Sequence, residues 1–453
     1  MSTAARRILT LAVALCAVLA MAAAMFLAPR FFTGAPEAFY TPASTKPAAA
    51  AQPALSRLDA DAPVPETGIL TAQLDAILAD RDDGAKFTAQ VVDVATGKVL
   101  YDRHAETPGT PASSLKVATA VAALDTLGGD AQLPTTVLLD GDVLVLRGGG
   151  DVLLGSGESD DSHPRGYAGL GTLAQLAAKQ LEQRGIDSVK LWLDDSLFAD
   201  AHHTSAWDQS LYTSNNIADI YPLAHYGGRA GASLSSAYQA DAANEARKSF
   251  AAALSKYVAV ETGGRGTYSG GEQIAQVRSA PLREQLRHML LVSDNYMAET
   301  MGRLVALKLG MDPSQGPQAV AKVAEKFDAK GLELEDTSGL AAKDRISPAA
   351  LTALLRGAAD SPKAELRELA YSLPVAGYTG TLMTRLGQDS TAGLVRAKTG
   401  SLAGVATLTG LTVTADGRQL AFSIFVNQPG GPVAPHKPVI DQAAAAIHGC
   451  GCN

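Results

Sequence analysis

The chain has 453 residues, a formal net charge of −8, a pI near 5.5, 47% hydrophobic residues and 19% charged residues. This length leaves room for two or three domains with sizeable cores, and the composition excludes a wholly disordered chain. The acidic balance, with no run of Lys or Arg in the body of the chain, argues against a nucleic-acid partner. The three cysteines, Cys16, Cys450 and Cys452, lie near the two ends, so thiol chemistry is not expected to drive catalysis.

The N-terminus has the pattern of an export segment. Arg6 and Arg7 precede an almost uninterrupted apolar run over residues 8–27, which is long enough to cross a bilayer. The positive charges on the cytoplasmic side would leave the rest of the chain outside the cytoplasm. The small residues 22–24 fit a cleavage site, whereas the apolar run continues beyond them. A cleaved signal peptide and a membrane anchor therefore both remain open for residues 1–28.

An extended linker and the first folded elements are predicted next. Residues 29–67 are rich in Ala and Pro, a composition that cannot bury a core. A short helix is expected over residues 73–80. Alternating hydrophobic residues and a central turn then predict a hairpin formed by residues 88–94 and 98–102. Pro111 suits the start of a longer helix.

The pattern changes between residues 132 and 274 to short strands, Gly-rich turns and one helix over residues 173–184. We expect an inserted, mostly β domain there. The strands are predicted at residues 136–139, 143–147 and 189–193. A strong helical period follows over residues 281–309, and Ser347 is expected to cap a further helix that ends near Gly357.

The C-terminal part returns to strands. A hairpin is predicted from residues 405–414 and 419–427, followed by a helix over residues 439–447. Two hairpins that flank helices indicate one antiparallel sheet with strands from both ends of the chain. The predicted organisation is a signal or anchor at 1–28, a linker at 29–67, a first catalytic part at 68–131, an insert at 132–274, a second catalytic part at 275–448 and a tail at 449–453.

Ser113 and Lys116 are the first candidate catalytic pair. On a helix, a spacing of three residues puts both side chains on one face. A lysine acts as a base only when burial or a nearby cation lowers its pKa, and Lys398 could be that cation. The first helical turn also offers the Ser113 N–H as half of an oxyanion hole.

A Ser-x-x-Lys spacing alone arises often by chance. Two further motifs follow it in order, Ser293-Asp-Asn and Lys398-Thr-Gly. These three motifs together are typical of β-lactamases and penicillin-binding proteins.

Over roughly residues 70–447 the chain resembles the class C low-molecular-mass penicillin-binding proteins, which are D-alanyl-D-alanine carboxypeptidases and endopeptidases of peptidoglycan. The resemblance implies an α+β, serine β-lactamase/transpeptidase-like fold, with an antiparallel sheet flanked by helices. The interval between Ser113 and Ser293 looks short for the family members with two inserts, so one insert is expected. The similar stretches, in the same order, are Pro111-Ala-Ser-Ser-Leu-Lys-Val-Ala-Thr-Ala, Arg147-Gly-Gly-Gly-Asp, Leu193-Asp-Asp-Ser-Leu-Phe, Ser293-Asp-Asn-Tyr-Met-Ala-Glu, Asp336-Thr-Ser-Gly-Leu and Arg396-Ala-Lys-Thr-Gly-Ser-Leu.

The resemblance implies a serine carboxypeptidase that cleaves D-Ala-D-Ala peptides through an acyl-enzyme and is inhibited by penicillins, with endopeptidase activity left open. It needs no cofactor and no metal. Its partners would be peptidoglycan peptides, β-lactams as inhibitors, and the membrane through the N-terminal segment. The catalytic residues would be Ser113 as nucleophile, Lys116 as base and Ser293 as proton relay.

Four further residues would bind the substrate. Asn295 would hold its amide, and Lys398 with Thr399 would meet its terminal carboxylate. Ser401 would add a hydroxyl and the second oxyanion N–H. A cation in a partly dry cleft attracts such a carboxylate strongly.

Two competing functions remain open at this point. A β-lactamase on the same fold needs fast deacylation, and no Glu-x-x-x-Asn element is found near Glu333 or Glu335. A non-catalytic peptidoglycan-binding or β-lactam-sensing protein is the other alternative.

Two serine stretches imitate the motifs: Ser44-Thr-Lys lies in the linker, and Ser214-Asn-Asn lies in a turn-rich part of the insert.

Overall fold

The computed structural model describes residues 61–450, apart from 82, 388–389, 429–430 and 433. The predicted export segment, nearly all of the linker and Cys452 therefore lie outside the described residues. Among the helices of the described part, none has the length and apolar character needed to cross a membrane.

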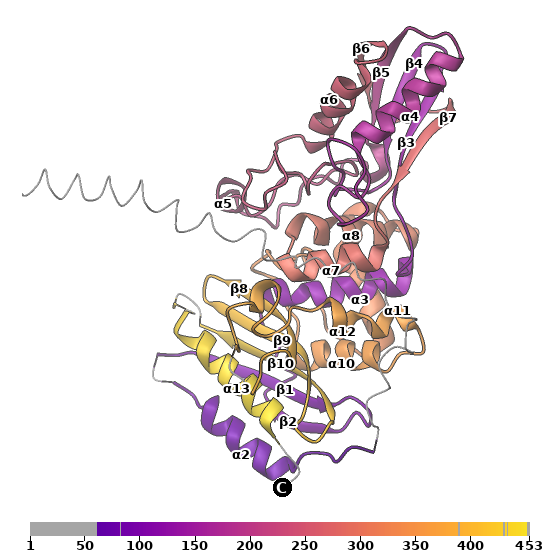
Figure 1. The fold of residues 1–453 in the computed structure, drawn as a ribbon. Helices are drawn as coiled ribbons and strands as arrows, with labels where there is room; N and C mark the ends of the chain where they lie inside the picture. The colour runs from indigo at the N-terminus through magenta and orange to yellow at the C-terminus, as the bar shows by residue number, and fades with distance from the viewer. Residues whose placement is uncertain (1–60, 82, 388–389, 429–430, 433, 451–453) are drawn as a thin grey trace, which may run out of the picture. The chain divides into compact units, whose positions relative to one another are not determined.

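A five-stranded antiparallel sheet joins the two ends of the folded chain, as predicted (Figure 1). Its strand order is β2-β1-β10-β9-β8. The N-terminal hairpin enters the sheet through β1, which pairs with β10 over its whole length. The strands are β1 Lys86–Asp93, β2 Val99–Arg103, β8 Val395–Leu402, β9 Val405–Val413 and β10 Gln419–Asn427.

Helices cover both faces of this sheet. On one face, α2 (Thr67–Ile77) and α13 (Lys437–Gly449) share a hydrophobic core with the strands. On the other, α10 (Pro348–Ala359) packs on β1 and β10, and α3 (Leu115–Leu127) packs on α10. Strands β9 and β10 are therefore buried along nearly their whole length. This arrangement is the α+β fold that the sequence predicted.

The insert contains a second, mixed sheet in the order β6-β5-β4-β3-β7. Strand β3 pairs antiparallel with β4 and β7, whereas β5 pairs parallel with both β4 and β6. Parallel neighbours cannot be joined by a tight turn, so helices make the crossovers. The strands are β3 Pro134–Asp140, β4 Val143–Gly148, β5 Ser188–Asp194, β6 Ala259–Arg265 and β7 Glu272–Arg278, and the helices are α4 Leu170–Gln183, α5 Gln209–Thr213 and α6 Ala242–Leu254. The insert is thus less purely β than predicted, because α6 was missed.

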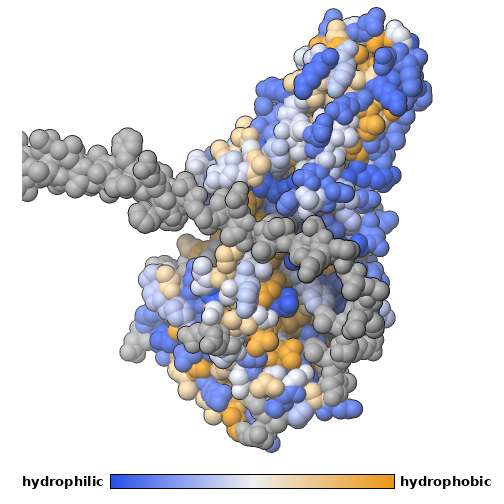
Figure 2. All heavy atoms as spheres, viewed as in Figure 1, coloured by the Kyte–Doolittle hydropathy of each residue, from blue (hydrophilic) through white to orange (hydrophobic). Residues whose placement is uncertain are grey.

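The insert shares its hydrophobic core with the catalytic part. Buried residues of the insert sheet, such as Leu146 and Leu193, belong to one cluster with Val121 of α3 and Met301. On the face drawn in Figure 2, hydrophobic side chains form separate patches between hydrophilic ones. The insert boundaries at residues 132 and 274 stay predictions.

The strong helical period over residues 281–309 corresponds to two helices. Helix α7 (Leu282–Val292) ends at Ser293, whose φ of 59° is left-handed. Asp294 then caps α8 (Asn295–Lys308) by accepting a hydrogen bond from the Met297 N–H at 3.0 Å. Aspartate is a preferred cap because its oxygen satisfies a free N–H of the first turn. The remaining helices are α9 Gly316–Ala324, α11 Ala364–Arg367 and α12 Leu369–Ser372.

The main sheet contains a buried ion pair whose loss should be costly. Arg418 donates to both oxygens of Asp93, at 2.6 Å each, and both side chains are almost fully buried. In Arg418→Ala the carboxylate stays buried without its bidentate partner, so the free energy of unfolding should fall by about 3–5 kcal/mol. Urea denaturation followed by tryptophan fluorescence would measure it. The control is Arg184→Ala, which breaks an exposed pair with Glu272 and should cost less than about 1 kcal/mol. Equal losses in the two variants would contradict the prediction.

Candidate active site

Ser113 lies in a 3₁₀ turn, Ala112–Ser114, that leads directly into α3. The residue before it, Ala112, has a left-handed φ of 46°, which is strained for a residue with a side chain. Ser113 itself is half-buried. Its N–H belongs to the start of the helix, where backbone donors have no partner within the helix. The predicted nucleophile therefore stands at a helix start with hydroxyl and N–H close together.

Lys116 is fully buried, and its Nζ has three oxygen neighbours. These are Ser113 Oγ at 2.9 Å, Asn295 Oδ1 at 2.7 Å and the Ser338 carbonyl oxygen at 2.6 Å. Burial lowers the pKa of Lys116 to about 8, although nearby carboxylates led by that of Asp336 act to raise it. The fraction of neutral amine near neutral pH is thus far larger than for an ordinary lysine.

The three neighbours decide what the neutral amine can do. A neutral amine has two N–H donors and one lone pair. The amide oxygen of Asn295 and the carbonyl of Ser338 only accept, so they take the two donors. The lone pair is then left for Ser113, whose hydroxyl can donate to it. The geometry suits removal of the Ser113 proton by Lys116.

The amide of Asn295 is oriented from the insert. Its Nδ2 donates to the Asn216 carbonyl at 2.9 Å, so its Oδ1 faces Lys116. Asn216 belongs to the Ser214-Asn-Asn stretch that imitated a motif in the sequence. The stretch does lie in a turn, beyond α5, and its carbonyl contacts the site. Ser293 is half-buried at the junction of α7 and α8, two residues before Asn295, and no hydrogen bond joins it to Ser113 or Lys116 within residues 61–450.

Lys398 and Thr399 lie within β8, directly before the hairpin strands β9 and β10. Lys398 is fully buried, and its Nζ donates to the Thr399 carbonyl at 2.7 Å. Burial, together with the charges of Lys116 and Arg385, holds the pKa of Lys398 well below its ordinary value. Burial is the main cause of the lowered pKa of Lys116 as well, and Lys398 is not among the main causes there. The hydroxyl of Thr399 donates to that of Thr381 at 2.8 Å.

Ser401 is exposed near the end of β8, an edge strand of the sheet. Backbone groups of a strand alternate between its two sides. The Ala397 N–H and the Val395 carbonyl bond to residues 374 and 376, on the side away from β9. By the same alternation, the N–H of Ser401 points away from β9. The pairing of β8 with β9 therefore does not use this N–H, and its role as the second oxyanion donor stays a prediction.

Strand β8 approaches the Ser113 turn closely at Gly400. A Cβ there would collide with the Thr407 hydroxyl and the Pro111 carbonyl. Thr407 Oγ1 donates to that carbonyl at 2.9 Å and lies 2.8 Å from Ser114 Oγ. Glycine is thus required because the strand and the turn are in van der Waals contact.

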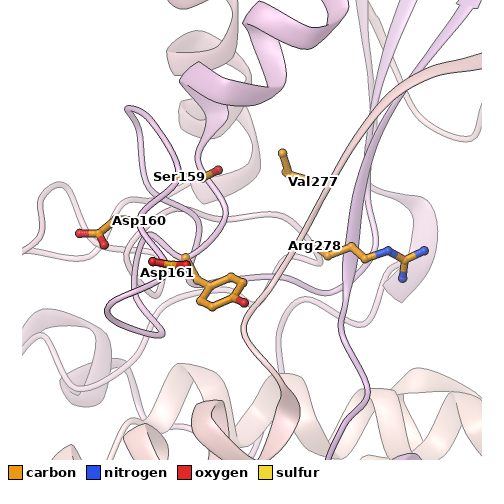
Figure 3. Close-up of a pocket in the computed structure, with 6 residues that line it drawn as sticks. Ser159, Asp160, Asp161, Val277 and Arg278 are labelled. Atoms are coloured by element: carbon orange, nitrogen blue, oxygen red, sulfur yellow. The ribbon is translucent and has the colours of Figure 1, made fainter. Parts of the chain in front are cut away.

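A separate cleft of about 520 Å³ lies in the insert. Figure 3 shows Asp160 and Asp161 on a loop there and Arg278 turned away from them. None of its lining residues belongs to the three motifs, and the hydroxyl oxygen of its one serine, Ser159, accepts from the Gly169 N–H at 2.9 Å. We do not assign the chemistry to it.

Sequence reasoning missed several residues of the site. Asn216, Ser338 and Pro111 contribute backbone carbonyls, which leave no signature in side-chain chemistry. Thr381 and Thr407 contribute single hydroxyls without a motif. Two stretches singled out in the sequence contain missed residues: Asp336-Thr-Ser-Gly-Leu contains Ser338, and Ser214-Asn-Asn contains Asn216.

The comparisons agree with this architecture. The model of the D-Ala-D-Ala carboxypeptidase 3 (S13) family matches residues 70–237 and 228–446. The chain is 36% identical over 452 residues to "Carboxypeptidase DacB" of Mycolicibacterium smegmatis, covering 96% of each chain. It is 28% identical to a D-alanyl-D-alanine carboxypeptidase of Actinomadura, covering 83% of this chain and 84% of the relative.

The solved structure of penicillin binding protein 4 (dacB) from Haemophilus influenzae has the same fold. It superposes with a TM-score of 0.64 at 22% identity, covering 83% of this chain and 98% of that one. Taken with the match over most of the chain, these findings show that the protein belongs to the D-Ala-D-Ala carboxypeptidase 3 (S13) family.

Proposed function

We propose that the chain is a serine D-alanyl-D-alanine carboxypeptidase that acts on peptidoglycan stem peptides through an acyl-enzyme. The observation that carries this proposal is the buried Lys116, whose Nζ lies 2.9 Å from Ser113 Oγ and whose pKa is lowered to about 8. Family membership and the relatives named as carboxypeptidases support it. They do not favour a β-lactamase or a non-catalytic protein.

Acylation begins with the loss of the Ser113 proton to Lys116. The Ser113 oxygen then forms a bond with the carbonyl carbon between the two D-alanines, and the carbonyl oxygen becomes an oxyanion. The N–H groups of Ser113 and Ser401 donate to it. Donors aimed at the developing charge stabilise the transition state more than the ground state.

The leaving group is the amine of the terminal D-alanine, which needs a proton. We propose that Ser293 passes it the proton that Lys116 took, so that the C–N bond breaks and Lys116 is neutral again. Asn295 holds the substrate amide. Lys116 then removes a proton from a water molecule, whose oxygen attacks the carbonyl carbon of the acyl-enzyme. The bond to Ser113 breaks and Ser113 regains a proton, so that the shortened peptide is released.

Preference for a free C-terminal carboxylate would come from Lys398 and Thr399. In the unbound site, Lys398 is buried with its pKa well below the ordinary value. An incoming carboxylate supplies the opposite charge that favours the ammonium form. β-Lactams would acylate Ser113 in the same way, and penicillin binding protein 4 from Haemophilus influenzae has been solved in complex with a β-lactam.

The family's substrate lies in the cell wall, so the enzyme acts outside the cytoplasm. We propose that the apolar segment over residues 8–27 directs export and that the Ala- and Pro-rich linker separates it from the catalytic part. Whether this segment anchors the enzyme would be seen by fractionating cells into membrane and soluble proteins.

A fluorescent penicillin tests the nucleophile. The wild type should be labelled covalently and should release D-alanine from a peptide ending in D-Ala-D-Ala, because Ser113 is the attacking group. Ser113→Ala should lose both activities. Ser114→Ala, the adjacent serine whose hydroxyl lies against Thr407, should keep the label. Labelling of Ser113→Ala as strong as that of the wild type would refute the assignment.

D-alanine release and cross-link cleavage, measured together, would separate carboxypeptidase from endopeptidase activity.

The pH dependence tests the base. Only neutral Lys116 accepts a proton, so the rate of labelling should rise with pH through about 8. Asn295→Asp places a carboxylate where Oδ1 lies 2.7 Å from Nζ, which stabilises the ammonium. The rise should therefore move to higher pH by about 1–3 units.

The control for this experiment is the same chemical change elsewhere. Asn244→Asp introduces a carboxylate beside Arg247 in α6 and should leave the midpoint of the rise unchanged. A rate that is independent of pH in the wild type, or a downward shift in Asn295→Asp, would rule out Lys116 as the base.

A further inference from the structure

The carboxylate of Asp336 is buried and accepts an unusually large set of hydrogen bonds. Four come from successive backbone N–H groups of the turn over residues 338–341. The Ser338 hydroxyl at 3.2 Å and the Trp207 indole Nε1 at 2.9 Å add two more. Hydrogen bonds to a charged acceptor are stronger than those between neutral groups. The turn is therefore held from inside by one side chain.

Residues 337–339 touch Lys116 and its neighbours in sequence at three points. The Ser338 carbonyl accepts from Lys116 Nζ at 2.6 Å, and the Thr337 carbonyl accepts from the Thr119 hydroxyl at 2.6 Å, one helical turn further along α3. Gly339 has a φ of +83°, and a Cβ on it would collide with the Ala112 carbonyl. The turn thus fits against both the base and the turn that carries Ser113.

Trp207 links the same carboxylate to the insert. It is almost fully buried and packs edge-on against Tyr212, with ring centroids 6.1 Å apart. The insert therefore makes two polar contacts near Lys116, one from the Asn216 carbonyl to Asn295 and one from Trp207 to Asp336. The Asn216 contact orients Asn295 Oδ1, and the Trp207 contact reaches the Ser338 carbonyl through Asp336. These two oxygens are the acceptors of the N–H groups of Lys116.

We propose that Asp336 is a positioning residue for the catalytic base. By holding the turn, it directs the Ser338 carbonyl at Lys116 Nζ, so that the lone pair of the amine is left for Ser113, and Trp207 joins the insert to this arrangement. The inference rests on the proposed function, because it concerns the same base.

Charge gives the proposal a consequence that packing alone would not have. The carboxylates that act to raise the pKa of Lys116 are those of Asp336, Asp294, Glu299 and Asp344, and Lys398 is the neighbouring cation. Burial and the charge of Asp336 raise the pKa of Asp344 to about 10, so Asp344 is protonated at neutral pH. Glu299 forms an ion pair with Arg303. Asp336 should therefore contribute strongly to the potential at Lys116.

The first test is Asp336→Asn in the full-length protein, with the rate of penicillin labelling measured against pH. An amide has only one acceptor oxygen for the six donors, so the Ser338 carbonyl should no longer be held in position to accept from Lys116 Nζ. The plateau rate should therefore fall by about 10- to 100-fold. Loss of the negative charge disfavours the ammonium of Lys116, so the midpoint of the rise should move to lower pH by about 1 unit. A merely structural role would lower the rate without moving the midpoint.

A second pair of variants tests the proposal if Asp336→Asn fails to fold. The chain has two tryptophans, and each donates one hydrogen bond and packs edge-on against a tyrosine. Trp192 donates to the Gly266 carbonyl at 2.9 Å, also in the insert, and packs against Tyr268. Trp207→Phe should slow labelling by roughly threefold to tenfold, whereas Trp192→Phe should change it by less than about twofold.

The outcomes separate this inference from the proposed function. A wild type that takes no label overturns the proposed function. A labelled wild type with an unshifted midpoint in folded Asp336→Asn, or with equal rates in Trp207→Phe and Trp192→Phe, overturns the positioning role and leaves the function intact.

Discussion

The active site depends on one buried amine and on what surrounds it. Lys116 has no exposed surface, and its three oxygen neighbours come from the 3₁₀ turn before α3, from α8 and from the turn after Asp336. A buried ammonium is costly, and burial alone lowers the pKa of Lys116 into the range where a base is useful. The surrounding carboxylates oppose this shift and keep it moderate. The fold can be understood as the framework that holds this balance.

The neighbours of Lys116 also explain why the insert shares a core with the catalytic part. The amide that faces the amine is oriented by Asn216, and the turn that supplies the Ser338 carbonyl is tied to Trp207. A loosely attached domain could not hold a hydrogen bond to a group beside the base. The continuous hydrophobic cluster beneath both parts supplies that rigidity.

Much of this could be predicted from the sequence, and the failures have physical causes. Alternation and turns located β1, β9 and β10, and three ordered motifs located Ser113, Lys116 and Asn295. The break at Ser293 was missed because the hydrophobic period runs through it, although Asp294 is a good cap. Helix α6 was missed although its Ala-rich sequence and the Asp241 cap are local helical signals. The carbonyls of Asn216 and Ser338 could not be predicted, because every residue carries one.

The pairing of β1 with β10 has a consequence for when the active site forms during folding. Lys86 lies opposite Asn427, so the sheet closes only between the first and last thirds of the chain. The Lys398 strand and Gly400, which packs on the Ser113 turn, belong to the same late-arriving segment. Contacts so distant in sequence form slowly and only after the chain is nearly complete. A chain that lacks its last strands therefore holds its serine and lysine without a working site, and hydrolysis starts only once those strands have paired.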